Sequence, residues 1–133
     1  MGALSHVMRK GLKQIAHDAS VREAAKRMRD ERISALFVER DGSLIGIVTD
    51  TDVVRRGVAD GADLNKMTVE LIMTKPIATI ESVRTVQDAH DMMGDIGVRH
   101  LGVTEKGKLV GVISVRDLLV HFKRVSEPKI TQD

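Results

Sequence analysis

The chain has 133 residues, enough for one compact domain or for two small ones that must share a core. Lysine and arginine together number 21 and aspartate and glutamate 19, so the net charge of +2 provides no cationic field of the kind that steers nucleic acid. With no cysteine, tryptophan or tyrosine and only two phenylalanines, the composition excludes disulfides and thiolate metal sites and argues against stacking of single-stranded bases.

The chain also lacks the usual features of a membrane-bound or exported protein. Its apolar runs, such as 44–48 and 109–113, are as short as strands and are interrupted by glycine. Residues 1–10 lack the apolar centre of a secretory signal. We therefore expect a cytoplasmic protein that has neither a membrane nor a nucleic acid as its partner.

The first half of the chain alternates between patterns typical of strands and of helices. Ser20 and Glu23 have the spacing of a capping box, and an apolar stripe at helical spacing follows them. Two β-branched runs flank the turn Asp41-Gly42, which indicates a β-hairpin. In chain order we expect a short strand at 14–16, a helix from 21, strands at 35–39 and 44–48, a helix from 50 and a connection at 55–70.

The second half repeats this order at a constant offset of 65 residues. Between residues 7 and 54 that offset gives thirteen identical pairs without a gap, which indicates a tandem duplication. Copies of this size bury too little surface to be stable alone, so we expect them to share a core. The second set of elements is a strand near 77–80, a helix from 86, strands at 100–104 and 109–113, and a helix from 115. The predicted domains are a first repeat with N-terminal segment and linker at 1–66, a second repeat at 67–123, and a polar tail at 124–133.

Each copy ends in the same motif: a glycine inside a strand, a hydroxyl residue at the end of that strand, and an aspartate three residues later at a helix start. The motif residues are Gly46, Thr49 and Asp52 in the first copy and Gly111, Ser114 and Asp117 in the second. A hydroxyl and free amides at a helix N-terminus suit a phosphate, a carboxylate suits the two hydroxyls of a ribose, and the glycine leaves room for close approach. The same spacing is that of a capping box, so the motif alone leaves open whether it binds a ligand or only caps a helix.

The order of elements and the doubled Gly-aliphatic-aliphatic-Thr/Ser-x-x-Asp motif resemble a tandem pair of CBS domains, or Bateman module. The segments Ile33-Ser34-Ala35-Leu36 and Val98-Arg99-His100-Leu101 add to the resemblance, which covers about residues 5–123. It implies an α+β fold of two repeats, each strand-helix-strand-strand-helix, related by a pseudo-twofold axis and forming one compact module. We therefore expect no catalytic domain in the chain beside the two repeats.

The resemblance implies binding of adenine nucleotides in two clefts between the copies, with AMP ahead of ATP, ADP, NAD and S-adenosylmethionine as the ligand. In one cleft Asp117 would hold the ribose and Ser114 and Arg116 would face the phosphate. The adenine there would lie against residues of the first copy, namely Ile15, Ala16, Ile33, Ser34 and Ala35. The mirror cleft would combine Asp52 and Thr49 with Ile77, Ala78, Thr79, Val98 and Arg99, and His100 would follow Arg99 in the phosphate-facing segment.

Two departures from the family pattern make the clefts unequal. The basic residue that often precedes the aspartate is present as Arg116 but is replaced by Thr51 in the first copy. Asp50 adds a negative charge beside the phosphate position of that copy. We therefore expect the Asp117 cleft to be the better anion site and the Asp52 cleft to be weaker or empty.

No nucleophile, base and orienting group share a recognisable spacing, and the five histidines show no metal-ligand spacing, so we expect neither an enzyme nor a metal site. The leading hypothesis is a regulatory module that senses AMP, ADP or ATP and signals to an unidentified protein through a conformational shift. The alternative is a ligand-free scaffold for protein interaction or dimerisation. A homodimer is expected because the terminal helices carry more apolar residues than a small core needs, namely Val53, Val54, Leu118, Leu119 and Phe122.

Overall fold

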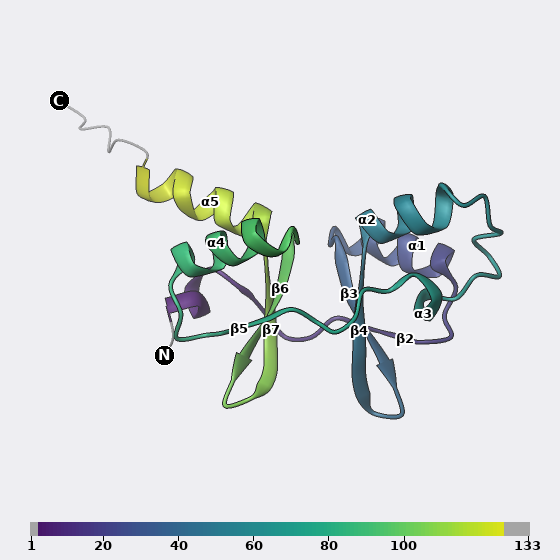
Figure 1. Ribbon diagram of the computed structural model, residues 1–133, viewed down its shortest axis with the longest axis horizontal. Helices are drawn as coiled ribbons and strands as arrows, with labels where there is room; N and C mark the ends of the chain where they lie inside the picture. Colours follow the sequence, from purple (N-terminus) through teal and green to yellow (C-terminus); the bar gives the residue numbers. More distant parts are fainter. Residues whose placement is uncertain (1–2, 127–133) are drawn as a thin grey trace. The chain divides into compact units, whose positions relative to one another are not determined.

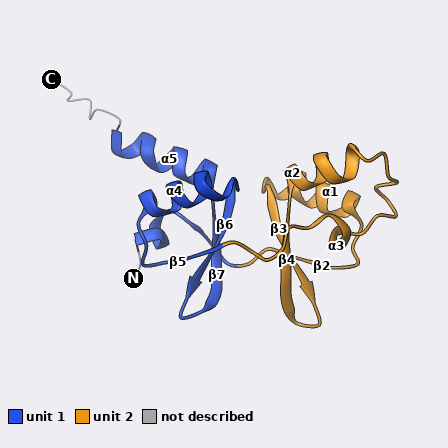
Figure 2. Ribbon diagram, in the orientation of Figure 1, with its two compact units in different colours: residues 1–11, 79–133 blue, residues 12–78 orange. Residues whose placement is uncertain are grey.

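The computed structural model describes residues 3–126, and residues 1–2 and 127–133 lie outside the described part of the chain. The chain divides into two compact units (Figure 2): unit 2 is residues 12–78, and unit 1 combines residues 1–11 with 79–133. Of the predicted polar tail, residues 124–126 end the last helix and the remainder falls outside the described residues. No helix among residues 3–126 is long and apolar enough to cross a lipid bilayer.

Unit 2 has the predicted order of elements (Figure 1). Strand β3 pairs in parallel with β2 and antiparallel with β4, which gives a three-stranded sheet. The second helix is irregular, since three α-helical residues continue into wider π-helical turns. The elements are β2 (Gln14–Ala16), α1 (Val21–Glu31), β3 (Ala35–Arg40), β4 (Ser43–Thr49), α2 (Asp50–Asp52), the π-helical segment (Val53–Val58) and α3 (Val69–Ile72).

Helix α1 forms where the capping signal places it. The side chain of Ser20 accepts a hydrogen bond from the backbone of Glu23 at 3.0 Å, which satisfies one free amide of the first turn. The apolar face of the helix is buried against one face of the sheet, where the burial of aliphatic side chains stabilises the unit. The buried residues of this cluster are Ile15, Val21, Ala24, Met28, Leu36, Val38, Val48, Val53, Val69, Ile72 and Met73.

Unit 1 repeats the order with one additional strand, so its sheet has four strands in the order β1-β7-β6-β5. The strand predicted near 77–80 is found at 79–81. The elements are the short 3-10 helix η1 (Ala3–His6), β1 (Arg9–Lys10), β5 (Thr79–Glu81), α4 (Val86–Ile96), β6 (His100–Glu105), β7 (Lys108–Ser114) and α5 (Val115–Ser126). Its fully buried side chains include Leu4, Leu101, Val103 and Ile113. The strand-helix-strand-strand-helix repeat is thereby confirmed in both units.

The N-terminal segment belongs to unit 1 because β1 pairs antiparallel with β7, with Arg9 opposite Val112. In unit 2 the same place beside β4 is taken by Thr74, which bridges Ile47. Thr74 lies 65 residues after Arg9, and Ile47 lies 65 residues before Val112. Residues 8–10 and 73–75 are therefore equivalent in their pairing as well as in sequence. The compact units therefore do not coincide with the repeats 1–66 and 67–123.

The two motif glycines lie where a neighbouring segment of the chain passes too close to the strand for a side chain to fit. A Cβ atom on Gly46 would lie 2.6 Å from the Met73 sulfur and 3.0 Å from the Thr74 carbonyl oxygen. A Cβ atom on Gly111 would overlap the carbonyl oxygen of Arg9. The sequence pattern indicated that something approaches these glycines closely, and the group that does so is the protein's own backbone.

This close approach generates a stability prediction. Gly111→Ala should destabilise the protein by about 1–3 kcal/mol, because the added methyl group forces β1 away from β7. Gly94→Ala is the matched control: it lies inside α4 with no atom within 4 Å of the added Cβ, and it should raise stability by about 1 kcal/mol. Urea denaturation followed by circular dichroism measures both. Wild-type stability for Gly111→Ala would contradict the β1–β7 pairing.

Candidate functional site

The motif of unit 1 forms a helix cap that leaves one carboxylate oxygen without a partner. The backbone nitrogen of Ser114 donates to Asp117 Oδ2 at 2.8 Å, and the Ser114 hydroxyl lies 3.0 Å from the same oxygen. In return the Asp117 nitrogen donates to the Ser114 hydroxyl at 3.2 Å. Within residues 3–126 no hydrogen bond reaches Asp117 Oδ1, and the residue is only half-buried. That oxygen remains able to accept hydrogen bonds from a ligand.

The motif of unit 2 forms the same cap, but both carboxylate oxygens are engaged. The nitrogen of Thr49 donates to Asp52 Oδ2 at 3.0 Å. The hydroxyl of Thr74 lies 3.1 Å from Oδ1 and 3.3 Å from Oδ2, and Arg56 Nε is 4.0 Å from Oδ1. Asp52 is 6% exposed. Both oxygens of Asp52 are thus in internal contacts and the residue is buried, so Asp52 is less accessible to a ribose than Asp117.

The first amide of the helix in each copy is also used internally. Val115 donates its backbone N–H to the carbonyl of Arg99 at 2.9 Å, and Asp50 donates to Ser34 at 3.0 Å. The amide of the motif aspartate is taken by the cap. The sequence analysis assigned free amides to a phosphate, but most of them are occupied, so attraction of an anion depends on cationic side chains instead.

Strand pairing brings Arg99 and His100, which the resemblance assigned to the cleft of Asp52, to the end of the sheet that carries the motif of unit 1. His100 lies directly opposite Ser114 in the β6–β7 pair, and Arg99 precedes it at the same end of the sheet. Arg99 and Arg116 are exposed. We call Arg99, His100, Ser114, Arg116 and Asp117 the Asp117 site, and we call the equivalent residues of unit 2 (Ser34, Ala35, Thr49, Thr51 and Asp52) the Asp52 site.

The remaining predicted ligand residues are divided between the units. Ile15, Ala16, Ile33, Ile77 and Ala78 belong to unit 2, and Thr79 and Val98 belong to unit 1. The side chain of Ile15 is 4% exposed and packs in the core cluster, and its backbone is paired with β3 opposite Val38, so Ile15 offers little to a ligand. The combination of residues from the two copies in one cleft, which the resemblance implies, stays a prediction.

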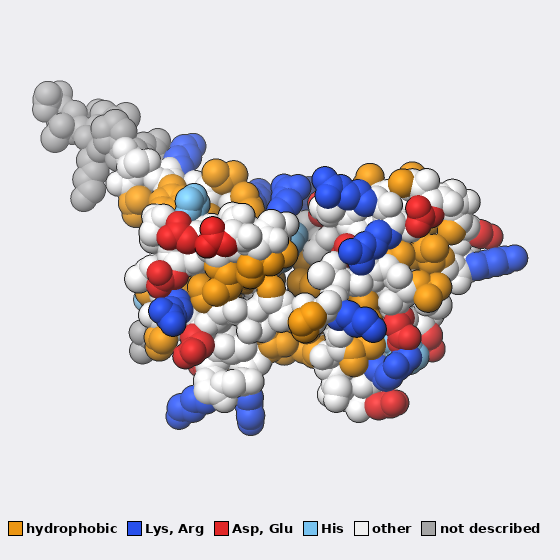
Figure 3. All heavy atoms as spheres, in the orientation of Figure 1, with side chains coloured by type: hydrophobic (Ala, Val, Ile, Leu, Met, Phe, Trp, Pro, Cys, Tyr) orange, Lys and Arg blue, Asp and Glu red, His pale blue; other side chains and the backbone are white. Residues whose placement is uncertain are grey.

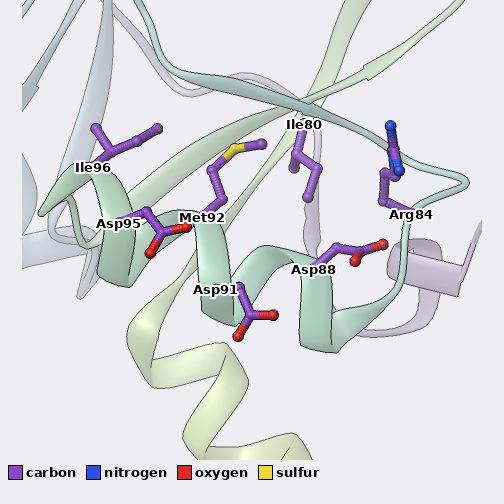
Figure 4. A pocket seen from close by; sticks show the side chains of 7 residues that line it. All are labelled: Ile80, Arg84, Asp88, Asp91, Met92, Asp95 and Ile96. Atoms are coloured by element: carbon purple, nitrogen blue, oxygen red, sulfur yellow. The ribbon is translucent and has the colours of Figure 1, made fainter.

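A hollow of about 410 Å³ beside α4 contains none of the predicted ligand residues (Figure 4). Its apolar lining comes from Ile80, Met92 and Ile96, and its charged lining from Arg84, Asp88, Asp91 and Asp95. Hydrogen bonds with His90 and Gln87 hold the pKa of Asp91 below its usual value, so this carboxylate is charged at neutral pH. Three carboxylates against one arginine repel phosphate groups, which makes this hollow unsuitable for a nucleotide. In the described part of the chain, no group of three or more acidic or histidine side chains is arranged to hold a metal ion.

The chain is thus a tandem-repeat protein with two α+β units, in each of which a Thr/Ser-x-x-Asp motif caps a helix. The family model of the CBS domain matches residues 4–59 and again residues 69–124. The chain therefore belongs to the CBS domain family, whose members are generally regulatory, and contains two such repeats.

Similar proteins have the same architecture. An uncharacterized 17.7 kDa protein of Acidianus ambivalens is 35% identical over 118 residues, which cover 84% of this chain and 70% of that protein. The crystal structure of an uncharacterized conserved protein from Pyrococcus horikoshii has a TM-score of 0.84 at 26% identity and covers 99% of this chain and 97% of that one. A hexameric CBS-CP12 protein from bloom-forming cyanobacteria has a TM-score of 0.81 at 31% identity, with coverages of 94% and 73%.

The two aspartates should differ in their contribution to stability. Asp52→Ala should cost about 2–4 kcal/mol, because besides the cap that both variants lose it leaves the Thr74 hydroxyl without its acceptor at a buried position. Asp117→Ala should cost about 1 kcal/mol, the value of a lost cap alone. Chemical denaturation of the two variants measures the difference. Equal losses would show that the Thr74 contact contributes nothing.

Proposed function

We propose that the protein is a regulatory module that binds an adenine nucleotide at the Asp117 site and signals its level to a partner protein. The observation that carries the proposal is the difference between the two motif aspartates. Asp117 keeps one oxygen for a ligand, whereas the carboxylate of Asp52 is occupied by Thr74. Two copies of one motif that served only as helix caps would have no need of this difference.

The chemistry of the Asp117 site suits a ribonucleotide. A carboxylate oxygen accepts hydrogen bonds from ribose hydroxyls, and each bond to a charged group contributes about 1.5–3 kcal/mol. The exposed guanidinium groups of Arg99 and Arg116 suit a phosphate, which arginine binds through two parallel hydrogen bonds. Micromolar affinity corresponds to about −8 kcal/mol, which a few such bonds and a buried adenine supply.

The Asp52 site is unsuited to the same ligand. Its aspartate is buried and both of its oxygens are in internal contacts, and Asp50 places a second negative charge where unit 1 has Val115. Binding there would have to break the Thr74 hydrogen bonds and overcome repulsion of the phosphate. We therefore expect one nucleotide per chain.

Regulation follows from linkage between ligand and conformation. A nucleotide that binds one conformation more tightly than another shifts the population towards the first, by no more than its difference in affinity for the two. A partner protein that recognises the favoured conformation then responds to the nucleotide concentration. No chemical step on the nucleotide is needed for this role.

Ligand binding can be measured directly. AMP, ADP and ATP should raise the melting temperature, and calorimetry should give one site per chain. Asp117→Ala should weaken AMP binding at least about tenfold through the lost charged hydrogen bonds. Asp95→Ala, which removes an exposed carboxylate from α4, is the control and should leave affinity unchanged.

The chain also provides a spectroscopic check, because without tryptophan, tyrosine or cysteine it absorbs little at 280 nm, and co-purified nucleotide would dominate the spectrum near 260 nm. A purified protein that binds none of AMP, ADP, ATP, NAD and S-adenosylmethionine would refute the proposal. It would favour the ligand-free scaffold, in which the motifs act only as caps.

We further propose that the protein forms a homodimer through the outer faces of its helices. Leu119 and Val125 on α5 are each 65% exposed, and Val54 on the π-helical segment is 59% exposed. Figure 3 shows apolar side chains reaching the surface along the helical side of unit 1. Val53 and Leu118 were also predicted to lie on this apolar surface. They are only 9% and 4% exposed, because they face inwards from their helices and pack in the cores.

A charged residue in place of one of these exposed apolar side chains should prevent dimerisation. Leu119→Asp should convert the dimer to a monomer in size-exclusion chromatography with light scattering, because a buried unpaired carboxylate is strongly destabilising at an interface. Val83→Asp, at a side chain that is 69% exposed and lies outside the helices, should leave the dimer intact. A wild-type protein that elutes as a monomer would contradict the dimer.

A further inference from the structure

Arg9 occupies in unit 1 the position that Thr74 occupies in unit 2. Arg9 pairs with Val112 in the β1–β7 ladder, and Thr74 makes the isolated bridge to Ile47. The Thr74–Ile47 bridge carries backbone hydrogen bonds of 2.8 and 3.0 Å in both directions. Because each segment is held against the last strand of its unit in the same register, the two side chains leave the backbone at equivalent points.

That position is adjacent to the motif aspartate. In unit 2 the hydroxyl of Thr74, one of the shortest polar side chains, reaches Asp52 at 3.1 Å. Val112 and Ser114 are two residues apart in β7 and therefore point to the same face of the sheet, and Arg9 opposite Val112 shares that face. His100, opposite Ser114, lies on the same face as well.

The Arg9 side chain is available for a ligand. It is exposed, and within residues 3–126 it makes no ion pair. The equivalent threonine, in contrast, is committed to its aspartate. A long cationic side chain beside Asp117 therefore replaces a short neutral one that closes Asp52.

The two sites differ in formal charge at four equivalent positions. Arg9, Arg99 and Arg116 of unit 1 correspond to Thr74, Ser34 and Thr51 of unit 2, and Val115 corresponds to Asp50. The lysines that follow, Lys10 and Lys75, are the same in both copies. At these positions unit 1 has three arginines and no added aspartate, whereas unit 2 has the additional Asp50 and no arginine; its one cation near Asp52 in the described part of the chain is Arg56, which is paired with that aspartate at 4.0 Å.

We infer that Arg9 is a specificity-determining residue of the Asp117 site, where it binds the phosphate groups of the nucleotide and restricts the site to phosphorylated nucleosides. The inference rests on the proposed function and deepens it by naming the ligand class. AMP, ADP and ATP carry the negative charge that three arginines attract. Adenosine lacks that charge, and S-adenosylmethionine carries a positive sulfonium group that these arginines repel.

The test compares ligands that share adenosine and differ in the number of phosphate groups. Arg9→Gln should weaken the binding of AMP about tenfold and of ATP by at least as much, the loss expected for one charge-assisted hydrogen bond, while leaving adenosine binding unchanged. Arg9→Lys should restore most of the AMP affinity, because it returns the charge. Arg22→Gln, which removes an exposed arginine from α1, is the matched control and should bind AMP as the wild type does. Isothermal titration calorimetry supplies the affinities, and unchanged melting temperatures exclude a folding defect.

The outcomes separate this inference from the proposed function. Wild-type AMP affinity in Arg9→Gln, together with the expected loss in Asp117→Ala, would overturn the role of Arg9 and leave the proposed function intact. An equal loss of AMP and adenosine binding in Arg9→Gln would also overturn it, because it would assign Arg9 to the nucleoside instead of the phosphate. A wild-type protein that binds no phosphorylated nucleoside would overturn both.

Discussion

The close passage of one backbone segment over a glycine in the last strand of each repeat is the constraint on which the architecture depends. At Gly46 the passing segment is 73–74, and at Gly111 it is 8–9. This contact fixes which segment borders the motif strand, and therefore which side chain stands beside the motif aspartate. A methyl group at either glycine would displace that segment. Close packing at the glycine therefore also determines which side chain lies beside the motif aspartate.

Because the chain is duplicated, its two copies can be compared with each other: they share one backbone arrangement and differ in their side chains. In unit 2 the bordering residue is Thr74, and its hydroxyl completes the hydrogen bonding of a buried aspartate. In unit 1 the bordering residue is Arg9, and Asp117 keeps one oxygen without a partner in the described part of the chain. In unit 2 the motif has the features of a structural cap. In unit 1 it caps the helix and also leaves one carboxylate oxygen of Asp117 able to accept a hydrogen bond from a ligand.

Much of the fold could be predicted because its signals are local or repeated. The Ser20 cap, the hairpin turns and the constant offset lie within short stretches of sequence, and the elements they predict are present. The pairing of Arg9 with Val112 was missed, because a two-residue strand has no periodicity and its partner is about a hundred residues away. The contact of Thr74 with Asp52 was also missed, because an isolated bridge has no periodicity and Thr74 lies 22 residues after Asp52. The identity of Met8 with Met73 and of Lys10 with Lys75 was the available signal, since it showed that the repeat begins before its first predicted strand.

The split composition of unit 1 has a consequence for synthesis on the ribosome. Unit 2 is continuous, so all of its strands are available once residue 78 has left the exit tunnel. The other unit needs residues from both ends of the chain, and β1 has no partner until β7 is made. Unit 2 can therefore complete its sheet before unit 1 does, and residues 9–10 have no partner strand until β7, about a hundred residues later in the chain, has been synthesised.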